Sequence, residues 1–105
     1  MKVEIFCVAD CPSQPAAVAL VKDVLATQGV EAGITEVLVT EEQTAHELRL
    51  PGSPTIRING QDVAEPPETG FALKCRFYPG SLRTGLPPAE LVHLAVAAAS
   101  ERGRP

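Results

Sequence analysis

The sequence predicts an α/β fold, a β-α-β-α-β-β-α sandwich built on a four-stranded mixed sheet. Short β-rich runs alternate with segments in which apolar residues recur at helical spacing. An Asn59-Gly60 pair separates two further short runs, and this pair is a strong signal for a β-hairpin. The 105 residues suit a single domain over residues 1–105, because domains usually contain about 100 to 150 residues.

The first half of the chain predicts a strand followed by a helix. Lys2 to Val8 is a β-rich run that ends in the turn-like Ala9-Asp10. A helical apolar stripe follows, and Gly29 is placed to end that helix as a C-terminal glycine. The stripe consists of Ala17, Leu20, Val21, Val24 and Leu25.

A second strand and a short helix are predicted next. Ile34 to Thr40 is rich in β-branched residues, which favour strands. Thr40 and Gln43 have the spacing of a capping box, which predicts a helix that continues to about Arg49. Two strands joined by a helix are expected to be parallel, with a right-handed crossover.

The second half predicts a hairpin and a last helix. The run Pro51-Gly52-Ser53-Pro54 interrupts the chain before a strand at Thr55 to Ile58. Gln61 to Ala64 is its expected partner, and residues 65–88 are expected to form a long loop. Pro87-Pro88 then opens a helix. Its predicted buried face consists of Leu91, Val92, Ala95, Val96 and Ala99.

Composition excludes several classes of function. Hydrophobic residues make up 45% of the chain and charged residues 21%, as in ordinary globular proteins. The net charge of −4 and the absence of Trp argue against a nucleic-acid-binding surface. No apolar run approaches the roughly 18 residues of a membrane helix, and the N-terminus lacks the pattern of a signal peptide. We therefore expect a cytoplasmic protein without a membrane partner.

The three cysteines are the main candidates for chemistry. They are Cys7, Cys11 and Cys75, an odd number, which in a reducing compartment suggests reactive or metal-binding thiols rather than a disulfide framework. Pro12 and Pro15 place the start of the first helix between Asp10 and Gln14. Cys11 is then at the N-terminal end of that helix, where backbone N–H groups and the helix dipole stabilise a thiolate. The neighbouring Asp10 carboxylate opposes this effect.

Two segments resemble the thioredoxin-like superfamily, and in particular the glutaredoxins. The run from Val3 to Pro12 resembles a first strand that leads into a Cys-Pro active-site turn. Ser53-Pro54-Thr55, with the hairpin residues that follow, is similar to the cis-proline loop. The resemblance implies that Cys11 is the nucleophile and Pro54 the cis-proline. It also implies that Ser53, Pro54 and Thr55 contact the substrate.

The same combination of Cys-Pro, Gly-Ser-Pro-Thr and a downstream Cys-Arg-x-Tyr resembles small bacterial thioredoxin-like proteins. Some of these carry an alkylmercury-lyase label, although this sequence shows no resemblance to the catalytic domain of that lyase. Arg76, in the Cys75-Arg76-Phe77-Tyr78 run, would bring a cation to the side on which glutaredoxins hold glutathione.

The resemblance does not supply a disulfide partner for Cys11, because Gln14 stands where it implies a second cysteine. Cys7 and Cys11 have C-x-x-x-C spacing. Four extended residues span roughly 13 Å, whereas the Cα atoms of a disulfide lie within about 7 Å. This pair therefore requires that Val8 to Asp10 fold back sharply. Alternation places Cys7 on one strand face with Val3 and Ile5, so we expect Cys75, in the long loop, to be the partner instead.

Several candidates also have purely structural interpretations. Cys7 is at least as well explained as a packed core residue, since free cysteine is often buried. We expect His46 and His93 to be surface residues, and no spacing typical of structural zinc is present. Arg57 and Arg76 could each recognise a carboxylate. A solvent-facing arginine is about twice as common an explanation for such residues.

Three functions follow as alternatives. The first is a thiol–disulfide oxidoreductase in which Cys11 attacks and Cys75, Cys7 or glutathione resolves the mixed disulfide, with no cofactor. Its partners would be protein or small-molecule disulfides and thiols. The second is a binding protein for mercury or a similar soft metal, since thiolates suit such ions. The third is a thioredoxin-fold interaction module without chemistry.

Overall fold

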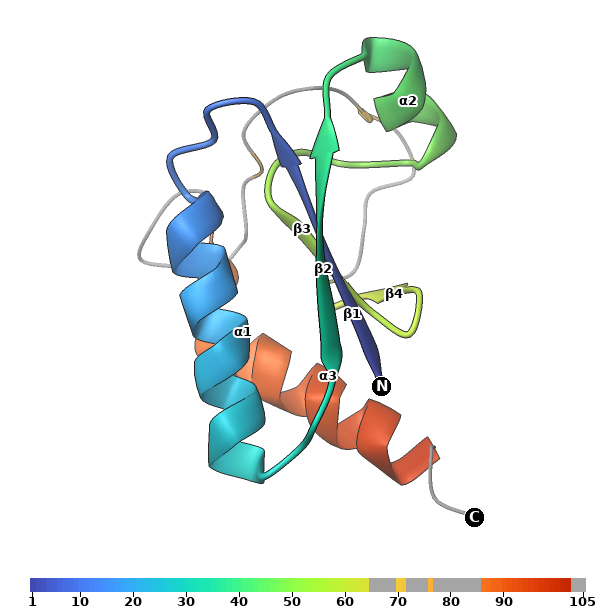
Figure 1. The fold of residues 1–105 in the computed structure, drawn as a ribbon. Helices are drawn as coiled ribbons and strands as arrows, with labels where there is room; N and C mark the ends of the chain where they lie inside the picture. The colour runs from blue at the N-terminus through green and yellow to red at the C-terminus, as the bar shows by residue number, and fades with distance from the viewer. Residues whose placement is uncertain (65–69, 72–75, 77–85, 103–105) are drawn as a thin grey trace.

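The computed structural model describes residues 1–64, 70–71, 76 and 86–102. Its described elements follow the order predicted from the sequence, β-α-β-α-β-β-α, and the four strands form one mixed sheet in the order β2-β1-β3-β4 (Figure 1). The architecture is compatible with a small thioredoxin-like α/β fold. The elements are β1 (Lys2–Val8), α1 (Gln14–Gln28), β2 (Gly33–Val39), α2 (Glu42–Glu47), β3 (Thr55–Ile58), β4 (Gln61–Asp62) and α3 (Ala89–Arg102).

Strand β1 is central to the sheet. It pairs in parallel with β2 along its whole length, and antiparallel with β3 from Val3 opposite Ile58 to Phe6 opposite Thr55. The carboxyl end of β1 and the start of β3 therefore meet at one end of the sheet (Figure 1). This end carries both of the loops that contain the candidate site, the one after β1 and the one before β3.

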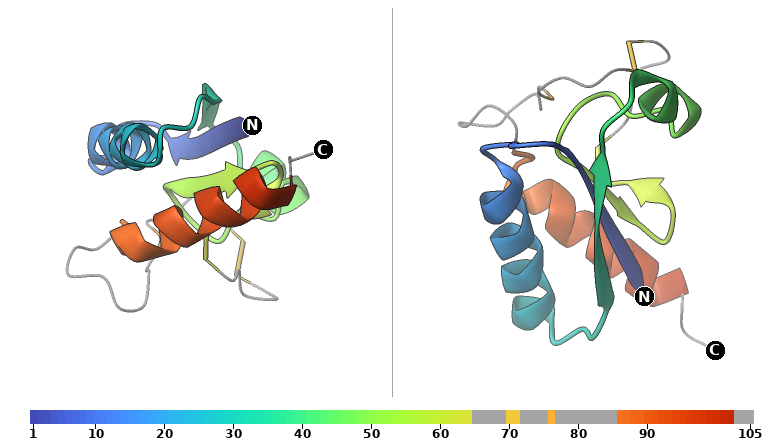
Figure 2. Two further views of the ribbon diagram at one scale, coloured as in Figure 1. Left: turned by 90° about the horizontal axis from the view of Figure 1, so that it is seen from below. Right: turned by 45° about the horizontal axis from the view of Figure 1, so that its top comes forward.

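Alternation along β1 divides its side chains between two clusters. Val3, Ile5 and Cys7 join the larger core cluster, which contains the buried residues of α1 and α3. Phe6 points to the other face and packs in a smaller cluster around Ala45 of α2. Helix α1 contacts β1, α3 contacts β3, and the two helices contact each other at an angle (Figure 2). The predicted placement of Cys7 with Val3 and Ile5 is confirmed.

The predictions for the long helices are confirmed. Gly29 ends α1 in the left-handed conformation, with a φ of 65°. The N–H groups of Gly29 and Val30 donate to the carbonyls of Ala26 and Leu25 in the last turn. Pro15 lies in the first turn of α1. In the stripe of α1 only Leu20 is half-buried, and in that of α3 Leu91 and Ala95 are half-buried. The remaining stripe residues are buried: Ala17, Val21, Val24, Leu25, Val92, Val96 and Ala99.

The hairpin turn also follows the prediction. Asn59 and Gly60 have φ angles of 52° and 84°, both positive, as a type I′ turn requires. Strand β4 ends at Asp62 rather than Ala64, because Asp62 Oδ1 accepts a hydrogen bond from the Ala64 N–H at 3.0 Å and turns the chain.

The predicted capping box was wrong. The N-cap of α2 is Glu41 rather than Thr40, and it makes no side-chain capping bond. Gln43 instead donates to Glu47, one turn further along the helix. The helix ends at Glu47, and Arg49 takes a φ of 56°, which leads the chain out of it. The box failed because the extended backbone of β2 and the segment after it continues through residue 41.

The predicted loop over residues 65–88 lies mostly outside the described residues. Within the part of the chain that is described, no helix is long and apolar enough to cross a membrane.

Candidate active site

Cys11 lies in the turn between β1 and α1. Asp10 has a φ of 56°, and this left-handed residue folds the chain back after the strand. The N-cap of α1 is Ser13, and the first helical N–H, that of Gln14, donates to the Cys11 carbonyl at 3.2 Å. Cys11 thus precedes the helix, and only 7% of it is exposed.

A hydrogen-bond donor at the Cys11 sulfur comes from the loop before β3. The Ser53 hydroxyl donates to Cys11 Sγ at 3.1 Å, and Ser53 Oγ accepts from the Val8 N–H, also at 3.1 Å. The antiparallel pairing of β1 with β3 places residue 53 opposite the end of β1, which explains the contact with Val8. The sequence expected helix N–H groups to stabilise the thiol. The hydrogen bond that the structure shows at this sulfur comes from a side-chain hydroxyl.

The Ser53–Pro54 peptide bond is cis, as the sequence suggested. Ser53, Pro54 and Thr55 are all buried. The Thr55 hydroxyl donates to the Gly52 carbonyl at 2.6 Å, which closes the loop on itself. The side chains of Ser53 and Thr55, both predicted to contact substrate, are therefore engaged within the protein.

Cys7 is a second thiol at the same place. It is only 2% exposed, and its pKa is raised from an ordinary value of 9.0 to about 11. Burial is the largest cause, because a thiolate loses hydration there, and the charge of Cys11 is the next. A hydrogen bond with the Cys11 side chain and the charge of Glu36 also raise the pKa, whereas the Ser53 hydroxyl lowers it.

Cys7 and Cys11 therefore interact directly, which the extended-chain argument did not expect. The strand does not end early: β1 runs to Val8, as predicted. The sharp turn at Ala9 and Asp10 instead folds Cys11 back over the strand face that carries Cys7. Both cysteines are free thiols and belong to the same core cluster.

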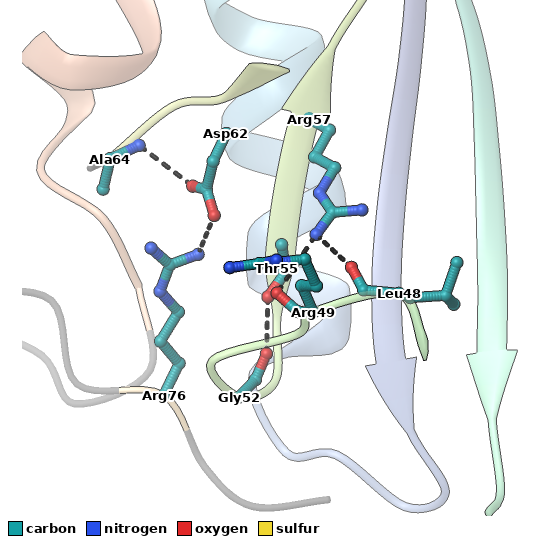
Figure 3. Close-up of polar contacts among 8 residues, drawn as sticks. All are labelled: Leu48, Arg49, Gly52, Thr55, Arg57, Asp62, Ala64 and Arg76. Atoms are coloured by element: carbon teal, nitrogen blue, oxygen red, sulfur yellow. Dashed lines mark hydrogen bonds and ion pairs between the residues drawn. The ribbon is translucent and has the colours of Figure 1, made fainter. Parts of the chain in front are cut away.

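Arg76 is buried rather than facing solvent, with 4% of its surface exposed. Its Nη1 lies 2.7 Å from Asp62 Oδ2, and the Asp62 side chain is 6% exposed (Figure 3). The Arg76 backbone N–H donates to the Ser53 carbonyl at 2.9 Å. Arg76 thus recognises a carboxylate, but one of its own chain. Asp62 was not singled out in the sequence, since one acidic residue after a turn carries no distinctive signal.

Arg57 is also engaged within the protein. Its Nη2 donates to the Leu48 carbonyl at 2.6 Å, and its guanidinium lies 5.1 Å from the centre of the Phe6 ring. This arginine ties β3 to the end of α2 (Figure 3).

Glu36 is a further neighbour of the thiols that sequence reasoning missed. It lies opposite Ile5 in the sheet, and its Oε1 accepts from Gln14 Nε2 at 3.0 Å. Gln14, the residue at the position of the absent second cysteine, thus ties the start of α1 to β2. Glu36 also helps to line an open groove of about 470 Å³ along α1 with Gln14, Pro15, Val18, Ala19 and Lys22.

The remaining candidates lie apart from the thiols or outside the description. Cys75 is not among the described residues, so its expected pairing with Cys11 stays a prediction. His46 is exposed as expected, whereas His93 is half-buried, with its carbonyl accepting from Gln28 Nε2 at 2.9 Å. In the described part of the chain, no three His, Cys, Asp or Glu side chains are grouped closely enough to hold a metal ion.

Comparisons of the chain with protein-family models, with curated proteins and with solved structures found no match. The site itself is a buried pair of thiols beside a cis-proline loop.

Proposed function

We propose that the protein is a thiol–disulfide oxidoreductase of the thioredoxin-like class, with Cys11 as its nucleophile. The observation that carries the proposal is the Ser53 hydroxyl bond to Cys11 Sγ, next to a second thiol at Cys7. A hydroxyl donor favours the thiolate, which is the nucleophilic form of cysteine. The thioredoxin-like resemblance of the Cys-Pro turn and of the Ser53-Pro54 loop points to the same class.

Cys7 and Cys11 have different surroundings, and these suit them to different roles. Cys7 keeps its proton at neutral pH, because its pKa is raised to about 11, and it is almost fully enclosed. Cys11 is the more exposed of the two and receives the Ser53 hydroxyl bond. We therefore assign the attack to Cys11 and the resolving step to Cys7.

The Cys11 thiolate attacks one sulfur of a substrate disulfide, forming a mixed disulfide and releasing the other sulfur as a thiolate, which takes a proton. Cys7 then loses its proton to water and attacks Cys11 Sγ. A Cys7–Cys11 disulfide forms and the second substrate thiol leaves, so two electrons have passed to the substrate. A thiol reductant such as glutathione or a dithiol protein restores the pair.

The electrostatics of the pair support this order of events. The charge of Cys11 is one of the causes that raise the pKa of Cys7. Once Cys11 is in the mixed disulfide it carries no charge, so that cause disappears and the pKa of Cys7 falls. Burial, the larger cause, remains, so formation of the mixed disulfide lowers the pKa of Cys7 only in part, but in the direction that favours its attack on Cys11. A reducing compartment such as the cytoplasm would keep both thiols reduced between cycles.

The test is reduction of a disulfide substrate, such as glutathionylated peptide, by the wild-type protein and by Cys11→Ser, Cys7→Ser and Cys75→Ser. We expect Cys11→Ser to abolish turnover and Cys7→Ser to trap a mixed disulfide on Cys11. Equal activity of the wild type and Cys11→Ser would reject the proposal, and no activity in either protein would leave a module without chemistry. Peptide mapping after mild oxidation identifies the partner: a Cys11–Cys75 link would transfer the resolving role to Cys75.

A second candidate is a soft-metal-binding protein, favoured by the direct interaction of the Cys7 and Cys11 thiols. Two thiolates are enough for linear coordination of an ion such as Hg²⁺. Titration with mercuric ion, followed by the thiolate-to-metal absorbance band, tests this. Stoichiometric binding that is lost in both Cys7→Ser and Cys11→Ser supports it, whereas binding that persists in Cys11→Ser rejects it.

A further inference from the structure

The Ser53 loop is held in place by contacts that come from outside the thiol site. The Ser53 carbonyl accepts the Arg76 N–H at 2.9 Å, and the Arg76 guanidinium is bound by Asp62 on β4 at 2.7 Å. Asp62 Oδ1 is in turn fixed by the Ala64 N–H at 3.0 Å. A continuous series of contacts therefore leads from β4, through Arg76 and Ser53, to Cys11 Sγ.

Gly52 shows how closely Arg76 is pressed against this loop. Gly52 has a φ of 152°, and a Cβ built there would lie 2.7 Å from Arg76 Cα and 2.8 Å from Arg76 N. Real Cβ atoms essentially never approach other atoms so closely. The backbone of Arg76 thus fills the space beside Gly52 and leaves the following Ser53 little freedom to move.

We infer that Arg76, anchored by Asp62, is a positioning residue that fixes the Ser53 hydroxyl at the Cys11 sulfur. The inference deepens the proposed function and rests on it in assigning Cys11 as the reacting thiol. Arg76 acts through Ser53, whose carbonyl accepts the Arg76 backbone N–H. The buried ion pair holds Arg76 in one place, because moving the guanidinium away would leave the buried Asp62 carboxylate unpaired. The position of the Ser53 loop therefore depends on the ion pair between Arg76 and Asp62.

The inference predicts a coupling between Asp62 and Ser53 that is measured at Cys11. The readout is the pH profile of Cys11 alkylation by iodoacetamide in the reduced protein, resolved from the other cysteines by mass spectrometry. Ser53→Ala should move the profile to higher pH by about one unit, as expected for loss of one hydrogen bond to a charged sulfur. Asp62→Asn should move it in the same direction by a smaller amount. In the double variant, Asp62→Asn should add nothing to the shift of Ser53→Ala.

Arg57→Gln is the matched control. It removes the contact of a half-buried arginine with the Leu48 carbonyl, without touching the Ser53 loop. It should lower the free energy of unfolding without moving the pH profile of Cys11 alkylation.

Arg76→Lys retains the backbone N–H and a positive charge, and it replaces Asp62→Asn in the experiment if that variant does not fold. It should give a smaller shift that also disappears in the Ser53→Ala background. All of these variants keep Cys7, Asp10 and Glu36, the other titratable groups of the described site, so their effects cancel in the comparison.

Two results would overturn the inference. One is a profile that Asp62→Asn and Arg76→Lys leave unmoved. The other is a shift that is the same in size with and without Ser53, since the effect would then reach Cys11 by another route. Alkylation requires no disulfide substrate, so the coupling is measured even if Cys11→Ser leaves disulfide turnover unchanged. Failure of the proposed function and failure of this inference are thus distinguishable.

Discussion

The Ser53 hydroxyl donates a hydrogen bond to Cys11 Sγ over 3.1 Å, although 42 positions separate the two residues in the chain. The same oxygen accepts the Val8 N–H, so the hydroxyl is oriented by the last residue of β1. Ser53 also lowers the pKa of Cys7. A single serine thus contacts Cys11 directly and also influences the neighbouring thiol of Cys7.

The first prediction concerns the order in which the thiols react. In the native reduced protein at pH 8, iodoacetamide should label Cys11 well before Cys7. With a pKa of about 11, only roughly one Cys7 thiol in a thousand is ionised at that pH, and burial hinders the reagent further. Peptide mass spectrometry over a time course measures both rates. In urea-unfolded protein the two should label at similar rates, and a Cys7 that labels as fast as Cys11 in the native state contradicts the prediction.

The second prediction is a loss of stability at alkaline pH caused by Cys7. Between pH 9 and pH 11 an unfolded Cys7 ionises while the folded one keeps its proton, so the folded state binds more protons and stability falls as the pH rises. The contribution is fully present below pH 9, and a pKa moved from 9.0 to about 11 corresponds to roughly 2–3 kcal/mol lost by pH 11. Urea unfolding of the reduced protein at several pH values measures it.

Cys7→Ala is the control for this pH effect. The variant should be less stable than the wild type at pH 7, because the substitution leaves a small cavity. Its free energy of unfolding should nevertheless decline less steeply between pH 9 and pH 11. Parallel curves for the two proteins would show that Cys7 is not the group responsible.

The third prediction concerns Gly52. Gly52→Ala should lower the free energy of unfolding by about 4 kcal/mol, since the new methyl group meets the Arg76 backbone and the residue has a φ of 152°. Gly60→Ala is the matched control, because Gly60 has a φ of 84° but nothing within 4 Å of its would-be Cβ. It should cost about 1–2 kcal/mol. Equal losses in urea unfolding would mean that the close approach of Arg76 does not constrain the loop.

The fourth prediction concerns the buried ion pair. Arg76→Met should lower the free energy of unfolding by about 3–5 kcal/mol, because it leaves the Asp62 carboxylate enclosed without its cation. Adding Asp62→Leu should recover part of that loss, since no unpaired charge then remains. Chemical unfolding of the single and double variants measures both effects. If Asp62→Leu lowers the free energy of unfolding as much in the Arg76→Met background as it does alone, the two side chains are not coupled.

The sequence alone determined the elements and much of their packing. Alternation in Lys2–Val8, the helical stripe that ends at Gly29 and the Asn59-Gly60 turn are local patterns, and each was found where it was expected. The cis peptide bond between Ser53 and Pro54 was likewise predicted from the sequence. The Thr40–Gln43 capping box failed although it too is local. A capping box with Thr40 as its N-cap requires helical backbone from the next residue onward, and here Glu41 is still extended.

Only the tertiary structure decided what surrounds the thiols. The left-handed turn at Asp10 brings Cys11 back to Cys7, and the antiparallel pairing of β1 with β3 brings Ser53 to both. Asp62 and Arg76 meet because β4 lies at the edge of the sheet beside that loop. Sequence patterns record which face of an element is apolar. The pKa of Cys7 and the donor at Cys11 depend on burial and on charges that come from distant parts of the chain, and these exist only once the sheet has formed.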